Sequence, residues 1–413
     1  MRLRGMVAVV SLLLASATAG CWADGPDPPG LGDPLAEVYR IPSPVPAPDA
    51  GRRQWAFTDV DNGLVAQGRR LASLDFATGS LRWAEDLPAA YAVTAANPPL
   101  VIDGQLVLRS VTGTSVRGQG AYEATPSWER KLPGRGQVLI AGSGPELAAV
   151  HSRCDARGCD LTAVLLASGK RAWQVRTPER VTLVDGGGDC HCLYTVGRRT
   201  IAELSPLDGR RLWSFPTPPG PAPVLQQSLY RLTVITPPVA PDCRVTLRGL
   251  ENGKQMWTRE LAWRDEAVEG PCGFDPSRVL ERYGLLVPGP GRLTLVDDYH
   301  GTLSEAPLRA GEQLVLGGLV WSAAGGYRQV LDQPVELPVP GPDSGRPWAG
   351  SAGGGWLLAS GPGVVLFHPG RGIRHRFDAA TAVVTLRDER LIYQVGDQLV
   401  ALGPQAQPEP AGA

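Results

Sequence analysis

The sequence has few of the residues on which nucleic-acid-binding and catalytic proteins depend. Its 413 residues include 40 basic and 41 acidic side chains, a formal net charge of −1, and five histidines. Only Lys131, Lys170 and Lys254 are lysines, so arginine supplies most of the positive charge. Nucleic-acid-binding domains usually carry a clustered basic excess, which this near balance does not offer. We therefore expect no nucleic-acid partner, and the preference for arginine indicates a GC-rich, actinobacterial source.

Familiar catalytic motifs are also missing. The sequence contains no HExxH, P-loop, GxSxG or dinucleotide-binding glycine fingerprint, and its histidines have no matched acid–base set beside them. Beyond the N-terminus no apolar stretch is long enough for a membrane helix. These absences favour a binding protein over an enzyme, and they predict no bound cofactor and no metal ion.

The N-terminus is similar to the signal of a bacterial lipoprotein. Arg2 and Arg4 precede an apolar run from Met6 to Ala17, which is too short to span a bilayer comfortably but suits a signal-peptide core. The run leads to TAGC, ending at Cys21. In such signals the cysteine becomes the lipidated first residue of the mature protein.

We therefore expect residues 1–20 to be a signal peptide and Cys21 to carry diacylglyceryl and palmitate groups. The protein would then be exported and anchored to the outer face of the cytoplasmic membrane. The alternative is a simple secretory peptide that is cut after Ala17 or Ala19 and leaves a free thiol.

Residues 21–50 are predicted to form a tether. They contain the Pro-rich pieces WADGPDPPGLGDP and IPSPVPAPDAG, a composition that favours extended chain. Between these pieces, residues 36–41 have the character of a single strand. This strand has no neighbour in sequence with which to pair.

Tryptophan recurs at a regular interval in the rest of the chain. Successive tryptophans are separated by 45, 45, 40 and 44 residues, at Trp83, Trp128, Trp173, Trp213 and Trp257. The segments between them are short and β-like, and the 51 glycines and 39 prolines are spread along the chain as turn residues. A period of about 40 to 45 residues is typical of propeller blades, each a four-stranded antiparallel sheet.

Four of these tryptophans follow a polar turn that ends in glycine: FATG, LASG, PLDG or LENG. Glycine allows the positive φ that such turns often need, and a fixed distance from the turn sets the side of the sheet on which the tryptophan lies. We expect one large side chain per blade to pack against the neighbouring blade. The residues assigned to this docking are Gly79, Trp83, Trp128, Gly169, Trp173, Gly209, Trp213, Gly253 and Trp257.

These units resemble the PQQ-like repeats and their tryptophan-docking motif, approximately Ala-x-Asp-x-x-Thr-Gly-x-x-x-Trp. SLDFATGSLRW matches at Asp75, Thr78, Gly79 and Trp83. Later units are less complete, and Glu305 stands where the sixth tryptophan is expected. The resemblance implies an all-β propeller over residues 51–405, with a disordered tail at 406–413. Quinoprotein dehydrogenases of this kind hold PQQ beside an adjacent-cysteine disulfide, which this sequence lacks.

We expect eight four-stranded blades, with seven or nine as alternatives, because the repeat is hard to count past residue 310. Residues 380–404 provide three strands and no fourth. An open propeller would expose unpaired strand edges. We therefore predict that Ala36–Ile41 completes the last blade by pairing near Gln398–Leu402, which would close the ring.

Three short motifs contain residue types that occur in metal or catalytic sites, but a structural role is favoured for each. DVDNG (Asp59–Gly63) resembles a Ca²⁺ loop but lacks the acidic twelfth residue, so a hairpin turn on Asn62-Gly63 is favoured. CHC (190–192) can bind a soft metal only with further ligands, and oxidised cysteine is favoured. DDYH (297–300) contains acid–base groups, but polar residues also belong in the turn where it occurs.

Six cysteines remain after Cys21, an even number that is compatible with disulfides in an exported protein. Six cysteines permit 15 pairings. We prefer a local bridge between Cys154 and Cys159, which lie on either side of a short loop. Cys243 and Cys272 would then form a bridge between adjacent blades, which leaves Cys190 and Cys192 as the third pair.

Two functions are compatible with these features. The first is a membrane-anchored, monomeric, non-catalytic propeller that binds an envelope protein or a small ligand. The second is a quinoprotein-like or hydrolytic enzyme with its site at the central channel. A convergent set of titratable residues at one channel mouth would favour the enzyme.

Overall fold

A computed structural model describes most of the chain after the N-terminal 34 residues. The described residues are 35–44, 54–57, 62–75, 77–94, 97, 99–102, 105–120, 122, 124, 126–185, 192–227, 231–265, 268–275, 280–281, 284–331, 335–342, 349–352, 355–361, 363–368, 372–377, 382–387, 390–395 and 397–404. The predicted signal peptide, Cys21, most of the tether and the predicted tail therefore lie outside them. Within them the only helices are two short 3₁₀ turns, η1 (Ala89–Tyr91) and η2 (Gly144–Glu146). No helix of this part could cross a membrane.

The described strands form nine antiparallel sheets of four strands, here called blades 1 to 9. Blade 1 contains β2 (Gln54–Phe57), β3 (Asn62–Gln67), β4 (Arg70–Asp75) and β5 (Leu81–Asp86). Blade 2 contains β6 (Leu100–Ile102), β7 (Gln105–Arg109), β8 (Ser115–Gln119) and β9 (Trp128–Lys131). Blade 3 contains β10 (Gln137–Ala141), β11 (Ala148–Asp155), β12 (Gly158–Leu165) and β13 (Arg171–Thr177).

The next three blades follow the same pattern. Blade 4 contains β14 (Val181–Asp185), β15 (Leu193–Gly197), β16 (Thr200–Leu204) and β17 (Arg211–Pro216). Blade 5 contains β18 (Val224–Gln227), β19 (Leu232–Thr236), β20 (Arg244–Glu251) and β21 (Lys254–Ala262). Blade 6 contains β22 (Leu280–Glu281), β23 (Gly284–Gly289), β24 (Arg292–Asp297) and β25 (Leu303–Pro307).

Blades 7 to 9 complete the ring. Blade 7 contains β26 (Gln313–Leu316), β27 (Leu319–Ser322), β28 (Gly326–Gln329) and β29 (Val335–Leu337). Blade 8 contains β30 (Ala349–Ala352), β31 (Gly355–Ser360), β32 (Gly363–His368) and β33 (Gly372–Phe377). Blade 9 contains β34 (Ala382–Arg387), β35 (Arg390–Val395), β36 (Gln398–Pro404) and β1 (Leu35–Pro42).

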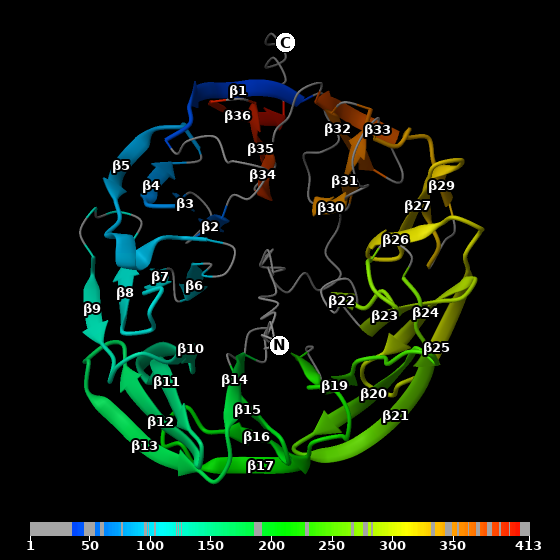
Figure 1. The fold of residues 1–413 in the computed structure, drawn as a ribbon. Helices are drawn as coiled ribbons and strands as arrows, with labels where there is room; N and C mark the ends of the chain where they lie inside the picture. The colour runs from blue at the N-terminus through cyan, green and yellow to red at the C-terminus, as the bar shows by residue number, and fades with distance from the viewer. Residues whose placement is uncertain are drawn as a thin grey trace, which may run out of the picture.

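The blades are arranged as a closed ring, the β-propeller predicted from the sequence (Figure 1). In blades 1 to 8 the four strands run in sequence order from the centre of the ring to its rim. Blade 9 has the order β1-β36-β35-β34, so β1 is its outermost strand.

Antiparallel order gives the ring two distinct faces. The hairpins between second and third strands, and the connections from each fourth strand to the next blade, lie on one face, which we call the connection face. The turns between first and second strands, and between third and fourth strands, lie on the opposite face, which we call the turn face.

The ring closes through pairing between the two ends of the described chain. In this antiparallel pair Leu35 lies opposite Pro404, and Pro42 lies opposite Gln398. This is the pairing that the unpartnered strand at residues 36–41 predicted. Tyr39 and Ile41 pack against a core cluster that joins blade 9 to blade 1.

The hydrophobic core is divided into clusters between neighbouring blades. One cluster joins Val150 and Leu161 of blade 3 to Leu183 and Leu193 of blade 4. Clusters of the same kind join the other described neighbours from blade 9 through blade 1 to blade 8. Apolar burial between faces, the main stabilising term, therefore makes each of blades 1 to 7 depend on its two neighbours.

The predicted count of eight blades is wrong for the described residues, which form nine sheets. Nine is one of the alternatives that the sequence left open, and two features made the blades past residue 310 hard to count. Blade 7 is built from strands of only three or four residues and has no tryptophan at the expected distance from a glycine turn. Blade 9 was predicted from its closing strand, but it is divided between the two ends of the chain and adds no tryptophan unit to the repeat.

Candidate functional site

The turns between third and fourth strands share one backbone geometry. The turn glycines in blades 1, 3, 4, 5 and 6 have φ values of 74°, 70°, 69°, 74° and 66°, in the left-handed region that favours glycine. In four of these turns the glycine N–H donates to the carbonyl four residues earlier. The pairs are Gly79 to Asp75 (2.8 Å), Gly169 to Leu165 (2.8 Å), Gly209 to Ser205 (2.9 Å) and Gly301 to Asp297 (2.8 Å).

Three of these glycines are covered by the tryptophan of the preceding blade. A Cβ added to Gly209 would lie 2.7 Å from Cδ2 of Trp173, and one added to Gly301 would lie 2.7 Å from Cδ2 of Trp257. Trp213 covers Gly253 in the same way. The glycine is therefore needed for the close approach of an indole ring as well as for the turn.

Hydrogen bonds hold two of these rings in place. Trp173 Nε1 donates to the Pro206 carbonyl at 2.6 Å, and Trp257 Nε1 donates to the Asp298 carbonyl at 3.0 Å. Both bonds cross from one blade to the next, so they satisfy a buried indole N–H at the seam. Trp213 Nε1 instead donates to the carboxylate of Glu203 in its own blade.

Two other docking glycines are covered by residues that the sequence analysis did not assign. Gly79 lies against the Tyr39 ring, because β1 supplies the fourth strand of the blade before it. Gly169 lies against Arg130, whose Nε and Nη2 donate to the carbonyls of Leu166 and Ala167, each at 2.9 Å. The contact of Tyr39 could have been predicted, because the closing strand was expected to be the fourth strand of the last blade. The contact of Arg130 could not, because the docking motif has no arginine position.

Trp83 and Trp128 lie at the expected positions on fourth strands but have no docking glycine as a contact. Trp83 is partly buried against the core cluster between blades 1 and 2. Trp128 lies over Gly118, its partner in the neighbouring strand of its own blade. Its blade lacks the glycine turn, and Arg130 makes the contact with the next blade instead.

The described cysteines form disulfides. Cys154 is bonded to Cys159 across the β11–β12 hairpin, and Cys243 is bonded to Cys272. Both bridges match the preferred pairings, and both lie on the connection face. Cys192 is also disulfide-bonded, whereas Cys190 lies outside the described residues.

The other short motifs have structural contacts. The carboxylate of Asp297 accepts the His300 amide at 2.6 Å, which caps the turn. Arg231 stacks on the Tyr299 ring at 4.4 Å and donates to its carbonyl at 2.8 Å. In DVDNG, Asn62 and Gly63 already belong to β3, and residues 58–61 lie outside the described part, as do residues 190 and 191 of CHC. Asn62 and Gly63 therefore lie in a strand and do not form the turn that the sequence predicted.

A network of titratable side chains joins blades 1 and 2. Buried Arg117 donates to the carboxylate of Glu85 at 2.5 Å and to the amide oxygen of Gln119 at 2.8 Å. The Tyr91 hydroxyl hydrogen-bonds to Ser115 at 2.7 Å and to Glu129 at 2.9 Å. Burial raises the pKa of Tyr91 to about 12. Arg117 Nη2 makes both of its bonds, whereas the buried Nε has no hydrogen-bond partner among the described residues, so the network is only partly satisfied.

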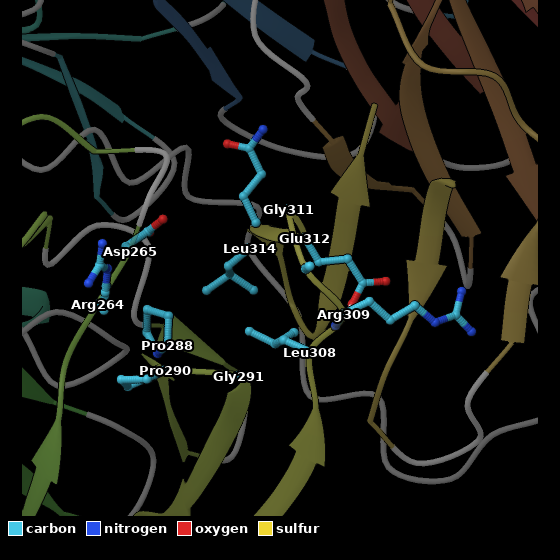
Figure 2. A pocket seen from close by; sticks show the side chains of 13 residues that line it. Arg264, Asp265, Pro288, Pro290, Gly291, Leu308, Arg309, Gly311, Glu312 and Leu314 are labelled. Carbon is cyan, nitrogen blue, oxygen red and sulfur yellow. The ribbon is translucent and has the colours of Figure 1, made fainter. Parts of the chain in front are cut away.

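A pocket of about 290 Å³ opens on the connection face where blades 5, 6 and 7 meet (Figure 2). Its apolar lining comes from the β23–β24 hairpin, through Pro288 and Pro290, and from Leu308 and Leu314. Figure 2 shows the charged residues on two sides, with Arg264 and Asp265 on one side and Arg309 and Glu312 on the other.

The charged side near blade 7 is fixed by hydrogen bonds. Arg328 donates to the two carboxylate oxygens of Glu312 at 2.7 and 2.5 Å, and the Arg309 amide donates to Oε2 at 2.7 Å. Burial alone would raise the pKa of Glu312, but these donors outweigh it and the pKa is lowered. Glu312 therefore remains a carboxylate at neutral pH, and its partners hold it in one orientation.

The opposite side is held by the loop after β21. The Arg264 amide donates to the Pro288 carbonyl at 2.8 Å, and the Cys243–Cys272 disulfide ties the loop back to blade 5. Trp263, 1% exposed, donates to the Gly273 carbonyl at 2.9 Å and packs edge-on against Phe274. Hydrogen bonds on one side and a disulfide on the other therefore hold both sides of the pocket.

Comparisons with known proteins support the repeat assignment. Residues 36–186 match a PQQ-like repeat family model that is described as outer membrane protein assembly factor BamB. The PQQ-like character predicted from the sequence is thus confirmed over this part of the chain. No curated protein sequence matches significantly.

Among solved structures, BamB from Moraxella catarrhalis is 13% identical, covering 90% of this chain and 100% of that one, with a TM-score of 0.31. The WD40 domain of Neurospora crassa Pan2 is 12% identical, covering 91% and 96%, with a TM-score of 0.39. Hsv2 from Kluyvelomyces marxianus is 11% identical, covering 68% and 84%, with a TM-score of 0.39.

The PQQ-like name raises the question of whether the residues suit a quinone and its metal ion. The sequence has no adjacent cysteines. Among the residues that the structure describes, no group of three or more His, Cys, Asp or Glu side chains is placed to hold a metal ion. The donor set of a quinoprotein is therefore not found in this part of the chain.

Proposed function

We propose that this protein is a non-catalytic β-propeller that binds a protein partner while a lipid on Cys21 anchors it to the outer face of the cytoplasmic membrane. The observation that carries the proposal is the pocket between blades 5, 6 and 7 on the connection face. The family-model match supports it, because that model is described as an assembly factor.

The size of the pocket favours a partner side chain over a large ligand. Small-molecule sites usually occupy about 300 to 1,000 Å³, and this pocket, at about 290 Å³, lies just below that range. One or two side chains of a partner would fill it. Pro288, Pro290 and Leu308 would contact an apolar anchor, as fully desolvated pockets do at interface hot spots.

The charges around the pocket would set the orientation of the partner. Arg264 and Arg309 would attract carboxylates of a partner, and Arg309 would exchange its present ion pair with Glu336 (2.6 Å). The buried carboxylate of Glu312 is already bonded to Arg328, so it would support the pocket wall. Because the disulfide and the Glu312–Arg328 pair already hold the walls, little conformational entropy would be lost on binding.

Site-specific photo-crosslinking in the native envelope tests the proposal. A photoreactive residue in place of Pro290 or Arg309 should form a discrete crosslinked species with another protein. The matched control is Arg157, which is exposed on the connection face of blade 3. Equal crosslinking at Arg157, or none at Pro290 and Arg309, would contradict binding at the pocket.

The anchor is tested separately by mass spectrometry of the mature N-terminus. We expect cleavage before Cys21 and a mass increase for diacylglycerol on its sulfur. The Cys21→Ser variant should be released from the membrane fraction. An unmodified terminus at Thr18 or Gly20 would refute lipidation without bearing on the pocket.

A further inference from the structure

Basic residues occupy the same turn position in three consecutive blades. Lys170, Arg210 and Lys254 each follow the docking glycine of blades 3, 4 and 5, and all three are exposed on the turn face. Two of the three lysines in the whole sequence are among them. Arg171 and Arg211 come next in the chain and are exposed as well.

Few carboxylates neutralise these residues. Arg210 lies 3.9 Å from Asp208, and Glu251 is already paired with Arg231 at 2.7 Å. Within the described residues, no carboxylate lies within ion-pair distance of Lys170 or Lys254. The turns of blades 3 to 5 therefore present positive charge to the solvent.

Exposed apolar side chains lie beside the same turns. Eleven large hydrophobic residues of the described chain are exposed, and eight of them lie at the turn-face ends of fourth strands, with exposures of 42% to 67%. These eight are Leu81, Tyr122, Leu207, Leu212, Met256, Tyr299, Leu303 and Val335. Only Val111 and Val239 of the eleven lie on the connection face.

Five of the eight lie on blades 4 to 6, next to the basic turns. They belong to β17, β21 and β25 or to the turns before these strands, along one arc of the rim (Figure 1). We call this arc, with Lys170, Arg210 and Lys254, the basic rim. Basic and apolar groups in this combination are typical of surfaces that lie in a membrane interface.

The described chain begins on the same face. A fourth strand starts on the turn face, so Leu35 at the start of β1 marks where the tether reaches the ring. The fourteen residues from Cys21 to Leu35 can extend over about 45 Å. In Figure 1 β1 lies across the ring from β17 and β21. The start of β1, where the tether joins the ring, and the basic rim are therefore on opposite edges of one face.

We infer that the turn face of the propeller lies on an anionic lipid surface, held by the lipid on Cys21 at one edge and by the basic rim at the other. The inference rests on the proposed anchor at Cys21. The basic side chains would contact lipid headgroups, and Leu212, Met256 and Leu303 would enter the interface. The connection face with its pocket would then point away from the membrane, towards a partner.

Vesicle binding of the full chain with Cys21→Ser isolates the contribution of the basic rim, because no lipid is then attached. The test variant carries Lys170→Gln, Arg210→Gln and Lys254→Gln. The matched control carries Arg157→Gln, Arg180→Gln and Arg198→Gln, three exposed arginines on the connection face of blades 3 and 4. Melting temperatures of the variants verify that each is folded.

Each basic residue near an anionic surface increases partitioning about fivefold, so the test variant should lose about 100-fold on vesicles of phosphatidylglycerol and phosphatidylcholine. The control should lose at most a few-fold. Equal losses in the two variants, or no binding of the parent to these vesicles, would overturn the inference. Binding that is unchanged in the test variant would instead assign the basic rim to a protein partner and also overturn it.

An environment-sensitive fluorophore gives a second measurement of orientation. Attached at Met256→Cys it should shift to the blue on anionic vesicles, whereas at Val239→Cys on the connection face it should not. A shift at both positions would contradict the proposed orientation. Mass spectrometry could find no lipid on Cys21 while both vesicle experiments give the expected result. The proposed lipid anchor would then be wrong, and binding of the basic rim to anionic lipid would remain supported.

Discussion

Replacing Gly209 with alanine tests whether the contact between tryptophan and glycine holds neighbouring blades together. Gly209 has a φ of 69°, and an added Cβ would lie 2.7 Å from Cδ2 and Cε3 of Trp173. Two costs therefore add. A left-handed alanine costs about 1–2 kcal/mol, and overpacking a fixed ring costs about 1–3 kcal/mol.

Gly291 provides a control with the same backbone. Its φ is also 69°, but an added Cβ would meet nothing within 4 Å. Gly291→Ala should therefore lose only the conformational part, about 1–2 kcal/mol of unfolding free energy. The difference between the two variants measures the clash with the indole ring.

A double-mutant cycle with Trp173→Ala completes the test. Trp173 is 7% exposed and donates to Pro206 at 2.6 Å, so its removal should cost about 3–5 kcal/mol. Once the ring is gone, Gly209→Ala should cost no more than Gly291→Ala. Urea unfolding of the four proteins gives the coupling energy. Additivity within about 0.5 kcal/mol, or equal losses for Gly209→Ala and Gly291→Ala, would refute docking as described.

Three further outcomes are expected. Deleting residues 22–34 should leave the melting temperature nearly unchanged, whereas deleting 22–42 removes β1 and should lower it by at least several degrees; equal values would mean that β1 does not close the ring. Cys243→Ser with Cys272→Ser should cost about 2–5 kcal/mol and speed amide hydrogen exchange in residues 263–275, whereas unchanged exchange would show that the bridge does not hold the pocket wall. Burial lowers the pKa of His151 below 6.5, so the unfolded state binds the proton first and the free energy of unfolding should fall as pH drops below about 6.5. The His151→Gln variant should show a weaker pH dependence of stability, and a pH profile identical to that of the parent would contradict this.

The sequence predicted the parts of the fold that depend on local pattern. The tryptophan period indicated four-stranded blades, and the unpaired strand at residues 36–41 indicated how the ring closes. Cysteine spacing across a short loop indicated the Cys154–Cys159 bridge. Each of these follows from one segment and its immediate requirements: a turn, a missing strand, or a short loop.

The candidate site could not be predicted in the same way. The pocket is formed by a hairpin of blade 6 and two connections, none of which carries a motif. The basic rim uses residues about 40 positions apart, and their common face appears only when the strand order is known. Leu212 and Met256 each precede a docking tryptophan and so lie on the opposite side of its strand, but the sequence does not show that no other element covers them.

The blade count failed because tryptophan is not the essential feature of a seam. What recurs is a flat or extended group lying over a glycine: Trp173 over Gly209, the Tyr39 ring over Gly79, and Arg130 over Gly169. In blade 7 the same pairing persists at another place, because Trp321 of the second strand lies against Gly341 in the connection to blade 8. Since the contact needs only a planar partner and a missing Cβ, selection can exchange the planar residue or move the pair. A count based on tryptophan spacing therefore stops where the substitutions begin, while the ring itself continues.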